Sequence, residues 1–66
     1  MIESVQIYGV GFYAVGTTVI RKVGGNDLEL NVVKIKKHLV GSGCDVYFSD
    51  NSKLVFTNLP MSFLVK

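Results

Sequence analysis

The chain has no tryptophan, one cysteine, one histidine and one proline among its 66 residues. The lone cysteine, Cys44, cannot form a disulfide within the chain. A structural zinc site needs four ligands, and Cys44 and His38 are the only two strong candidates. We therefore expect no metal and no cofactor. Small domains usually need a disulfide, a metal or self-association for stability, so self-association remains.

Charged residues are also scarce, at 18% of the chain, whereas apolar residues make up 48%. So short a chain has much surface and little interior. Many apolar side chains should then stay exposed on a monomer, and exposed apolar patches usually mark interfaces. We expect residues 1–66 to form a single small β-rich domain that associates into a homo-oligomer, most simply a two-fold dimer.

The formal net charge of +2 is too small to indicate nucleic-acid binding by itself. A lone thiol suits the reducing cytosol, so we expect a cytoplasmic protein. Glu3 and Gln6 interrupt the start of the chain, where a signal peptide would be apolar. Ser4–Ile20 has no charge, but it is short for a membrane span and rich in strand-forming residues. We expect no membrane partner.

The main signal along the chain is the alternation of apolar and polar residues, which is typical of strands. It predicts a first strand at 4–8, a glycine-induced bulge or bend at 9–11, and a second strand from about 12 to 23. In that second strand one face would carry Val15, Thr17, Val19 and Val23. The following Gly24-Gly25-Asn26-Asp27 predicts a turn.

The segment 28–40 fits two structures. As a helix over about 27–40, it would place Leu28, Val32, Ile35 and Leu39 on one stripe. As a strand, it would need a one-residue slip at the adjacent Val32 and Val33, which is the pattern of a β-bulge. We favour the strand, because a helix would leave Leu30, Val33 and Val40 on its exposed side.

The C-terminal third predicts a hairpin. Cys44, Val46 and Phe48 alternate with polar residues, 50–52 form a tight connection, and the return strand runs to Thr57. Pro60 confines the last element, 62–65, to the edge of a sheet. The expected fold is all-β, a small antiparallel barrel or curved sheet of five to six strands. In architecture it resembles an SH3-like or OB-like barrel. The alternative is α+β with the one helix.

No catalytic motif is convincing. Gly9-Val10-Gly11-Phe12-Tyr13-Ala14 matches a dinucleotide fingerprint, but the residues after it form helices poorly. Cys44 could pair with His38 as a nucleophile and base, but its alternation with Val46 places it inside. The five carboxylates are scattered. We expect no enzyme.

Basic residues carry the strongest functional signal. As a strand, 28–40 projects Lys34, Lys36 and His38 from one face, and Tyr47 would face outward on the following strand. Lysines beside an exposed aromatic ring can hold phosphate while a base stacks on the ring. Arg21 and Lys22 form a second small cluster. We expect a non-catalytic, oligomeric module that binds a nucleic acid or nucleotide through these residues.

Two other functions remain open. Very small chains without disulfides are often encoded by phages and other mobile elements, where they inhibit or bridge host proteins. Such a protein would bind a host protein through its apolar patch or by strand addition to a free sheet edge. The apolar excess also suits a structural subunit of a larger assembly.

Overall fold

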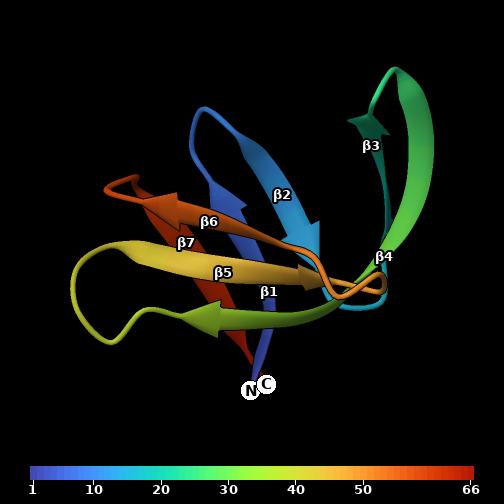
Figure 1. The fold of residues 1–66 in the computed structure, drawn as a ribbon. Coiled ribbons are helices and arrows are strands. Elements are labelled where there is room, and N and C mark those ends of the chain that lie inside the picture. Colours follow the sequence, from blue (N-terminus) through green and yellow to red (C-terminus); the bar gives the residue numbers. More distant parts are fainter.

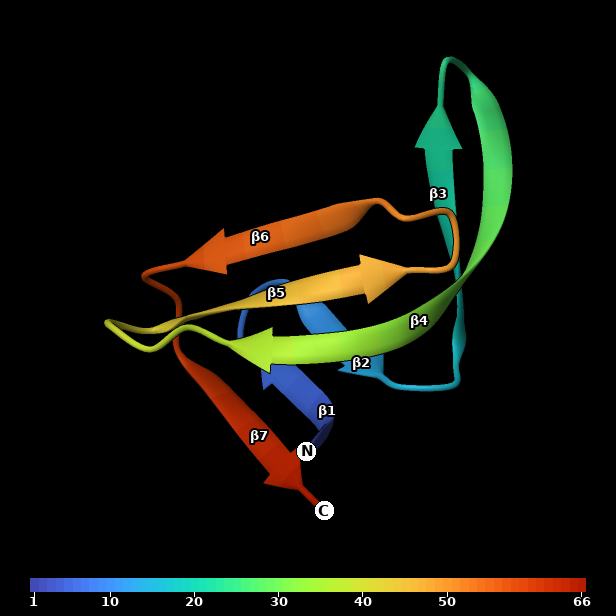
Figure 2. The same cartoon turned by 60° about the horizontal axis from the view of Figure 1, so that its bottom comes forward.

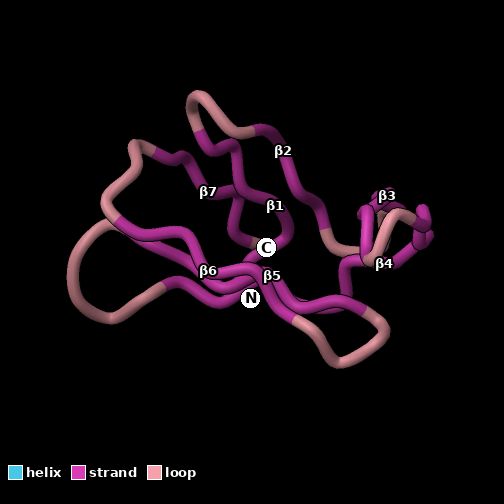
Figure 3. Tube along the Cα trace, turned by 45° about the horizontal axis from the view of Figure 1, so that its top comes forward, coloured by secondary structure: helices cyan, strands magenta, loops and turns pink.

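The structure is a computed structural model that describes residues 1–66, and it contains seven strands and no helix (Figures 1 and 3). The all-β prediction is therefore confirmed, and the alternative helix at 27–40 is wrong. No helix is present that could cross a membrane. The strands are β1 (Ile2–Ile7), β2 (Gly11–Ala14), β3 (Thr18–Val23), β4 (Asn26–Lys37), β5 (Gly43–Phe48), β6 (Lys53–Thr57) and β7 (Met61–Val65).

The strands form two antiparallel sheets, with the orders β2-β1-β7 and β3-β4-β5-β6. The long strand β4 changes partner along its length: residues 26–31 pair with β3 and residues 32–37 pair with β5. Figure 2 shows β4 curving between these two halves, so that the β3–β4 hairpin projects as an arm. Strands β4, β5 and β6 cross in front of β1 and β7 in Figure 1. The curved second sheet confirms the predicted architecture.

The partner change in β4 is accompanied by a register shift. Val32 lies opposite Phe48 and Lys34 lies opposite Tyr47, so Val33 is an extra residue in β4. This confirms the bulge predicted from the two adjacent valines. Because the bulge resets the alternation, Leu30, Val32 and Ile35 are all buried while Lys34 and Lys36 are exposed.

The prediction of one strand over 12–23 is wrong, and this segment supplies the additional strand beyond the expected five to six. The chain turns at residues 15–17 and passes from the first sheet into the second. The amide of Thr17 donates a hydrogen bond to the Ala14 carbonyl at 3.1 Å. Gly16 adopts a φ of +91°, which other residues rarely do. Apolar and polar residues happen to keep alternating across this corner, so the sequence pattern did not reveal the corner.

The strand predicted over 28–40 starts at Asn26 and ends at Lys37, and Val33 and Val40, which were expected to be covered in it, are 50% and 89% exposed. Three other sequence predictions agree with the structure. The segment Gly9–Gly11 forms the bend between β1 and β2, and no helix follows it. The predicted hairpin is β5–β6, closed by Asn51 with a φ of 71°. The predicted edge strand is β7, which pairs only with β1.

The core lies between the two sheets. Its eight buried side chains all come from β1, β4 and β5, and Phe48 is the largest of them. Tyr13 of β2 joins the layers, because its ring centroid lies 6.5 Å from that of Phe48 and 5.8 Å from that of Phe56. The core residues are Val5, Ile7, Leu30, Val32, Ile35, Cys44, Val46 and Phe48.

Candidate functional site

The outer face of β4, β5 and β6 carries a row of three aligned residues. Lys34 of β4 lies opposite Tyr47 of β5, and Tyr47 lies opposite Lys53 of β6. Directly opposed residues in an antiparallel sheet project from the same face. Because the neighbouring Val46 and Phe48 are buried in the core, this face is the outer one. We call Lys34, Tyr47 and Lys53 the basic row.

Within the basic row, the aromatic ring lies between two cations. The Nζ atom of Lys53 lies 5.7 Å from the Tyr47 ring centroid, within cation–π range. Both lysines are exposed and Tyr47 is half-buried. The row thus combines a fixed aromatic ring with two ammonium groups on flexible stems.

The next row of the same face is less basic. It contains Lys36, Asp45 and Val55 in register. His38 Nε2 donates a hydrogen bond to Asp45 Oδ1 at 2.9 Å, and both side chains are largely covered. The carboxylate therefore offsets the charge of Lys36, and His38 is already occupied by an internal partner. The structure places all of the predicted Lys34, Lys36, His38 and Tyr47 on one face, but with an acid among them.

A glycine makes the His38–Asp45 contact fit. Gly43 begins β5, and both the His38 ring and the Phe56 carbonyl oxygen lie close to the position that its Cβ atom would take. A Cβ atom at Gly43 would lie only 2.6 Å from that carbonyl oxygen and would also meet the His38 ring. Glycine is thus required here by close approach.

The second predicted cluster, Arg21 and Lys22, does not join the basic row. The two side chains lie on opposite faces of β3, since neighbours along a strand alternate. Arg21 Nη1 donates to Ser52 Oγ at 3.2 Å, and its guanidinium lies 5.3 Å from the Phe48 ring centroid. Lys22 lies opposite Asp27 on the arm. Arg21 therefore fixes the arm to the β5–β6 turn.

Sequence reasoning missed Lys53 and the role of Asp45. The hairpin itself contained the signal for Lys53. Tyr47 and Lys53 are equally distant from Asp50, so a hairpin centred at that turn sets them opposite each other. The partnership of Asp45 with His38 depends on the β4–β5 loop, whose geometry the pattern does not indicate.

Cys44 and His38 do not form a nucleophile–base pair. Cys44 is fully buried on the inner face, and His38 is held by Asp45 on the outer one. Burial, and secondarily the nearby Asp45 charge, raises the pKa of the Cys44 thiol above its ordinary value. The thiol therefore stays protonated near neutral pH. No three His, Cys, Asp or Glu side chains lie close enough together to hold a metal ion.

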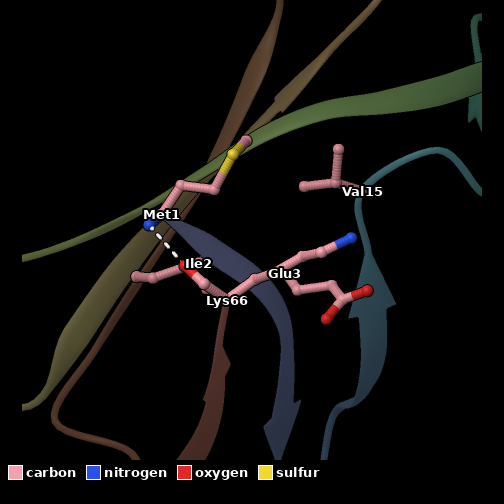
Figure 4. A pocket seen from close by; sticks show the side chains of 5 residues that line it. All are labelled: Met1, Ile2, Glu3, Val15 and Lys66. Atoms are coloured by element: carbon pink, nitrogen blue, oxygen red, sulfur yellow. Dashed lines mark hydrogen bonds between the residues drawn. The ribbon is translucent and has the colours of Figure 1, made fainter.

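Two hollows mark the surface near the start of β1. The larger, about 370 Å³, is lined by Met1, Ile2 and residues 33–37 of β4, and we call it the β4 groove. The smaller, about 210 Å³, lies where the two chain ends meet (Figure 4). Its only charged side chains are those of Glu3 and Lys66, which have opposite charges and so favour neither an anionic nor a cationic ligand. The β4 groove, by contrast, has three lysines and no acid.

Comparison with known proteins gives no further guide: no family model matches this chain, and no curated protein or solved structure is significantly similar to it.

Proposed function

We propose that this protein is a non-catalytic, oligomeric module that binds single-stranded nucleic acid or a nucleotide through the basic row. The observation that carries the proposal is the alignment of Lys34, Tyr47 and Lys53 across three adjacent strands. Neighbouring strands are about 4.8 Å apart, so the two lysine backbones lie roughly 10 Å apart with the ring between them.

This arrangement fits the two parts of a nucleotide. A base stacks on the Tyr47 ring, and stacking tolerates any base because every base has a π-face. The ammonium groups of Lys34 and Lys53 reach the phosphates on either side, and Lys36 adds a third cation further along the face. The Lys53 ammonium, which lies over the ring in the free protein, moves from the ring to a phosphate on binding.

The oligomeric part of the proposal is supported by exposed apolar side chains. Ile20 and Val23 on the arm are at least half exposed, and Leu39 and Val40 in the β4–β5 loop are 99% and 89% exposed. Covering such side chains with a second copy removes apolar area from water, which is favourable by about 25 cal/mol per Å². A single unbridged thiol, buried as Cys44 is, supports a cytoplasmic location.

Fluorescence anisotropy with a labelled ten-nucleotide thymidine strand tests the proposal, with ATP and inorganic tripolyphosphate as competitors. We expect a dissociation constant below about 100 µM in low salt, since non-specific binding to nucleic acid already reaches that level. ATP should compete better than tripolyphosphate, because only ATP carries a base. No binding below about 100 µM would overturn the proposal.

Three variants locate the site. Tyr47→Ala should weaken binding by about 5- to 150-fold, which is the loss of one stacked base. Lys53→Glu should weaken it as well, by placing an acid beside the phosphate. Lys22→Glu makes the same charge change on the arm and should leave the affinity unchanged. Equal losses in Lys53→Glu and Lys22→Glu would show that net charge alone drives binding, and would contradict the proposed site.

A further inference from the structure

The C-terminal half of β4 has one edge without a partner strand. In the sheet order β3-β4-β5-β6, β4 lies between β3 and β5. Pairing with β3 ends at Asn31, whereas pairing with β5 continues to Lys37. Beyond Val32, whose backbone groups bind Gly16 and Thr17, the β3 side of β4 is therefore unpaired.

The backbone groups of Ile35 and Lys37 point toward this free edge. The amide of His38 donates to the Gly43 carbonyl at 3.0 Å, so the hydrogen-bonding groups of His38 face β5. These groups alternate in direction along a strand. Lys36 and Lys34 accordingly face β5 as well, while Ile35 and Lys37 present donors and acceptors on the other side.

The free edge opens into the β4 groove. Met1 and Ile2 of the N-terminal segment also line this groove, which has a volume of about 370 Å³. On the inner face of β4, Ile35 is buried, and Lys37 Nζ lies 5.4 Å from the Phe63 ring centroid of β7. On the outer face, Lys34 and Lys36 are exposed. The outer face of the edge is thus basic, whereas the inner face is apolar at Ile35 and ends in the Lys37 ammonium, which lies over the Phe63 ring.

A second copy of this chain would pair poorly at this edge. Edge-to-edge association would bring two sets of Lys34, Lys36 and Lys37 together, and like charges on edge strands oppose such pairing. A ligand that complements the free edge of β4 therefore has negative charge and an extended backbone. We infer that the β4 groove binds an acidic peptide segment of a partner protein, which adds as a strand to the free edge of β4.

The two faces of β4 determine which side chains should alternate along the bound peptide. Side chains of an added strand alternate between the faces of the sheet. Acidic residues at every second position would lie beside Lys34 and Lys36, and apolar residues between them would lie toward Ile35, Met1 and Ile2. The site differs from the basic row because it uses the backbone edge of β4, although Lys34 belongs to both.

The test uses the full chain and labelled seven-residue peptides in which valine alternates with glutamate or with lysine. The glutamate peptide should bind and the lysine peptide should not. In the double variant Lys34→Glu, Lys36→Glu this preference should reverse, with the glutamate peptide losing about tenfold or more. No binding of the glutamate peptide at about 1 mM, or binding unaffected by the double variant, would overturn the inference.

Backbone methylation separates strand addition from simple charge attraction. N-methyl groups on one alternate set of peptide residues should abolish binding to the wild-type protein, and methyl groups on the other set should not. Equal binding of both methylated peptides would overturn the inference. Lys37→Pro removes a free-edge amide and should cost about fivefold, whereas Lys37→Ala keeps that amide.

The same variants keep this inference separable from the proposed function. Lys37→Pro lies outside the basic row, so oligonucleotide binding should persist in it and report a folded protein. If the thymidine strand fails to bind while the glutamate peptide binds, the proposed function fails alone. The reverse result defeats only the peptide inference.

Discussion

Replacing Gly43 with alanine tests the packing that organises the outer face. The added Cβ would lie 2.6 Å from the Phe56 carbonyl oxygen and would meet the His38 ring. The ring can rotate away, but it then loses its 2.9 Å hydrogen bond to Asp45. The carbonyl belongs to the backbone of β6, so relief there requires β5 and β6 to separate.

The expected loss of unfolding free energy in Gly43→Ala combines these two effects. Overpacking at a site without free space costs about 1–3 kcal/mol. A partly exposed hydrogen bond to a carboxylate adds about 0.5–1 kcal/mol after solvent screening. Gly43→Ala should therefore destabilise the protein by about 1.5–4 kcal/mol. Chains of this length have a free energy of unfolding of about 3–10 kcal/mol, so the melting temperature should fall by about 10–25 °C.

Urea denaturation followed by far-UV circular dichroism measures this cost, at one fixed protein concentration because association affects stability. Gly41→Ala is the matched control. Gly41 has a φ of +79° but open space around its Cβ position, so only the backbone cost of about 1–2 kcal/mol applies. In a His38→Ala background, Gly43→Ala should cost less. Wild-type stability of Gly43→Ala, within about 0.5 kcal/mol, would refute the reasoning.

Four further predictions concern charge, the thiol and association. If Lys34, Lys36 and Lys53 each neutralise one phosphate, a plot of the logarithm of oligonucleotide affinity against the logarithm of salt concentration should have a slope of about −2. Lys53→Ala should make this slope shallower by about 0.7. An unchanged slope in the variant would exclude Lys53 from the site. Buried Cys44 should not react with Ellman's reagent until denaturant is added, and rapid reaction of the native protein would contradict its burial. The pKa of the Cys44 thiol is raised in the folded state, so the thiol's contribution to the free energy of unfolding is complete below its ordinary pKa of 9.0 and is lost as the pH rises above that value. Urea titrations should therefore show stability falling at alkaline pH, and Cys44→Ala should remove the part of that fall that is due to the thiol. Light scattering behind a sizing column should report at least twice the 7.2 kDa chain mass at micromolar concentration, and a clean monomer would contradict the proposed association.

The fold was predictable from the sequence where alternation and burial agree. In β4 the adjacent Val32 and Val33 indicated both the strand and its bulge, because only a slip at that point buries Ile35 with Leu30. The β5–β6 hairpin was equally clear. Each of these elements has one buried and one solvated face, so its pattern carries the register.

The corner at residues 15–17 could not be predicted in the same way. Val15 and Val19 both pack against the core, but from opposite sides of a change of sheet. Alternation reports only which side of a strand faces apolar surroundings, and it does not report which sheet the strand joins. Gly16 was the available signal, and it has no proline or asparagine neighbour to strengthen a turn assignment.

The candidate site was predicted only in part: Lys34 and Tyr47 were expected, whereas Lys53 and the carboxylate of Asp45 were missed. Lys34 and Tyr47 were expected to share a face and they are directly opposed. The internal pairing of His38 with Asp45 required the return of the chain through the β4–β5 loop. Long-range pairing of this kind is set by the tertiary fold, so local periodicity does not contain it.

The most direct measurement of the central claim is a titration of ¹⁵N-labelled protein with the thymidine strand, followed by amide chemical shifts. The largest changes should lie at Lys34, Tyr47 and Lys53, with Lys22 on the arm unaffected. Changes confined to the arm, or no changes at saturating oligonucleotide, would contradict a nucleic-acid site on the outer face of β4, β5 and β6.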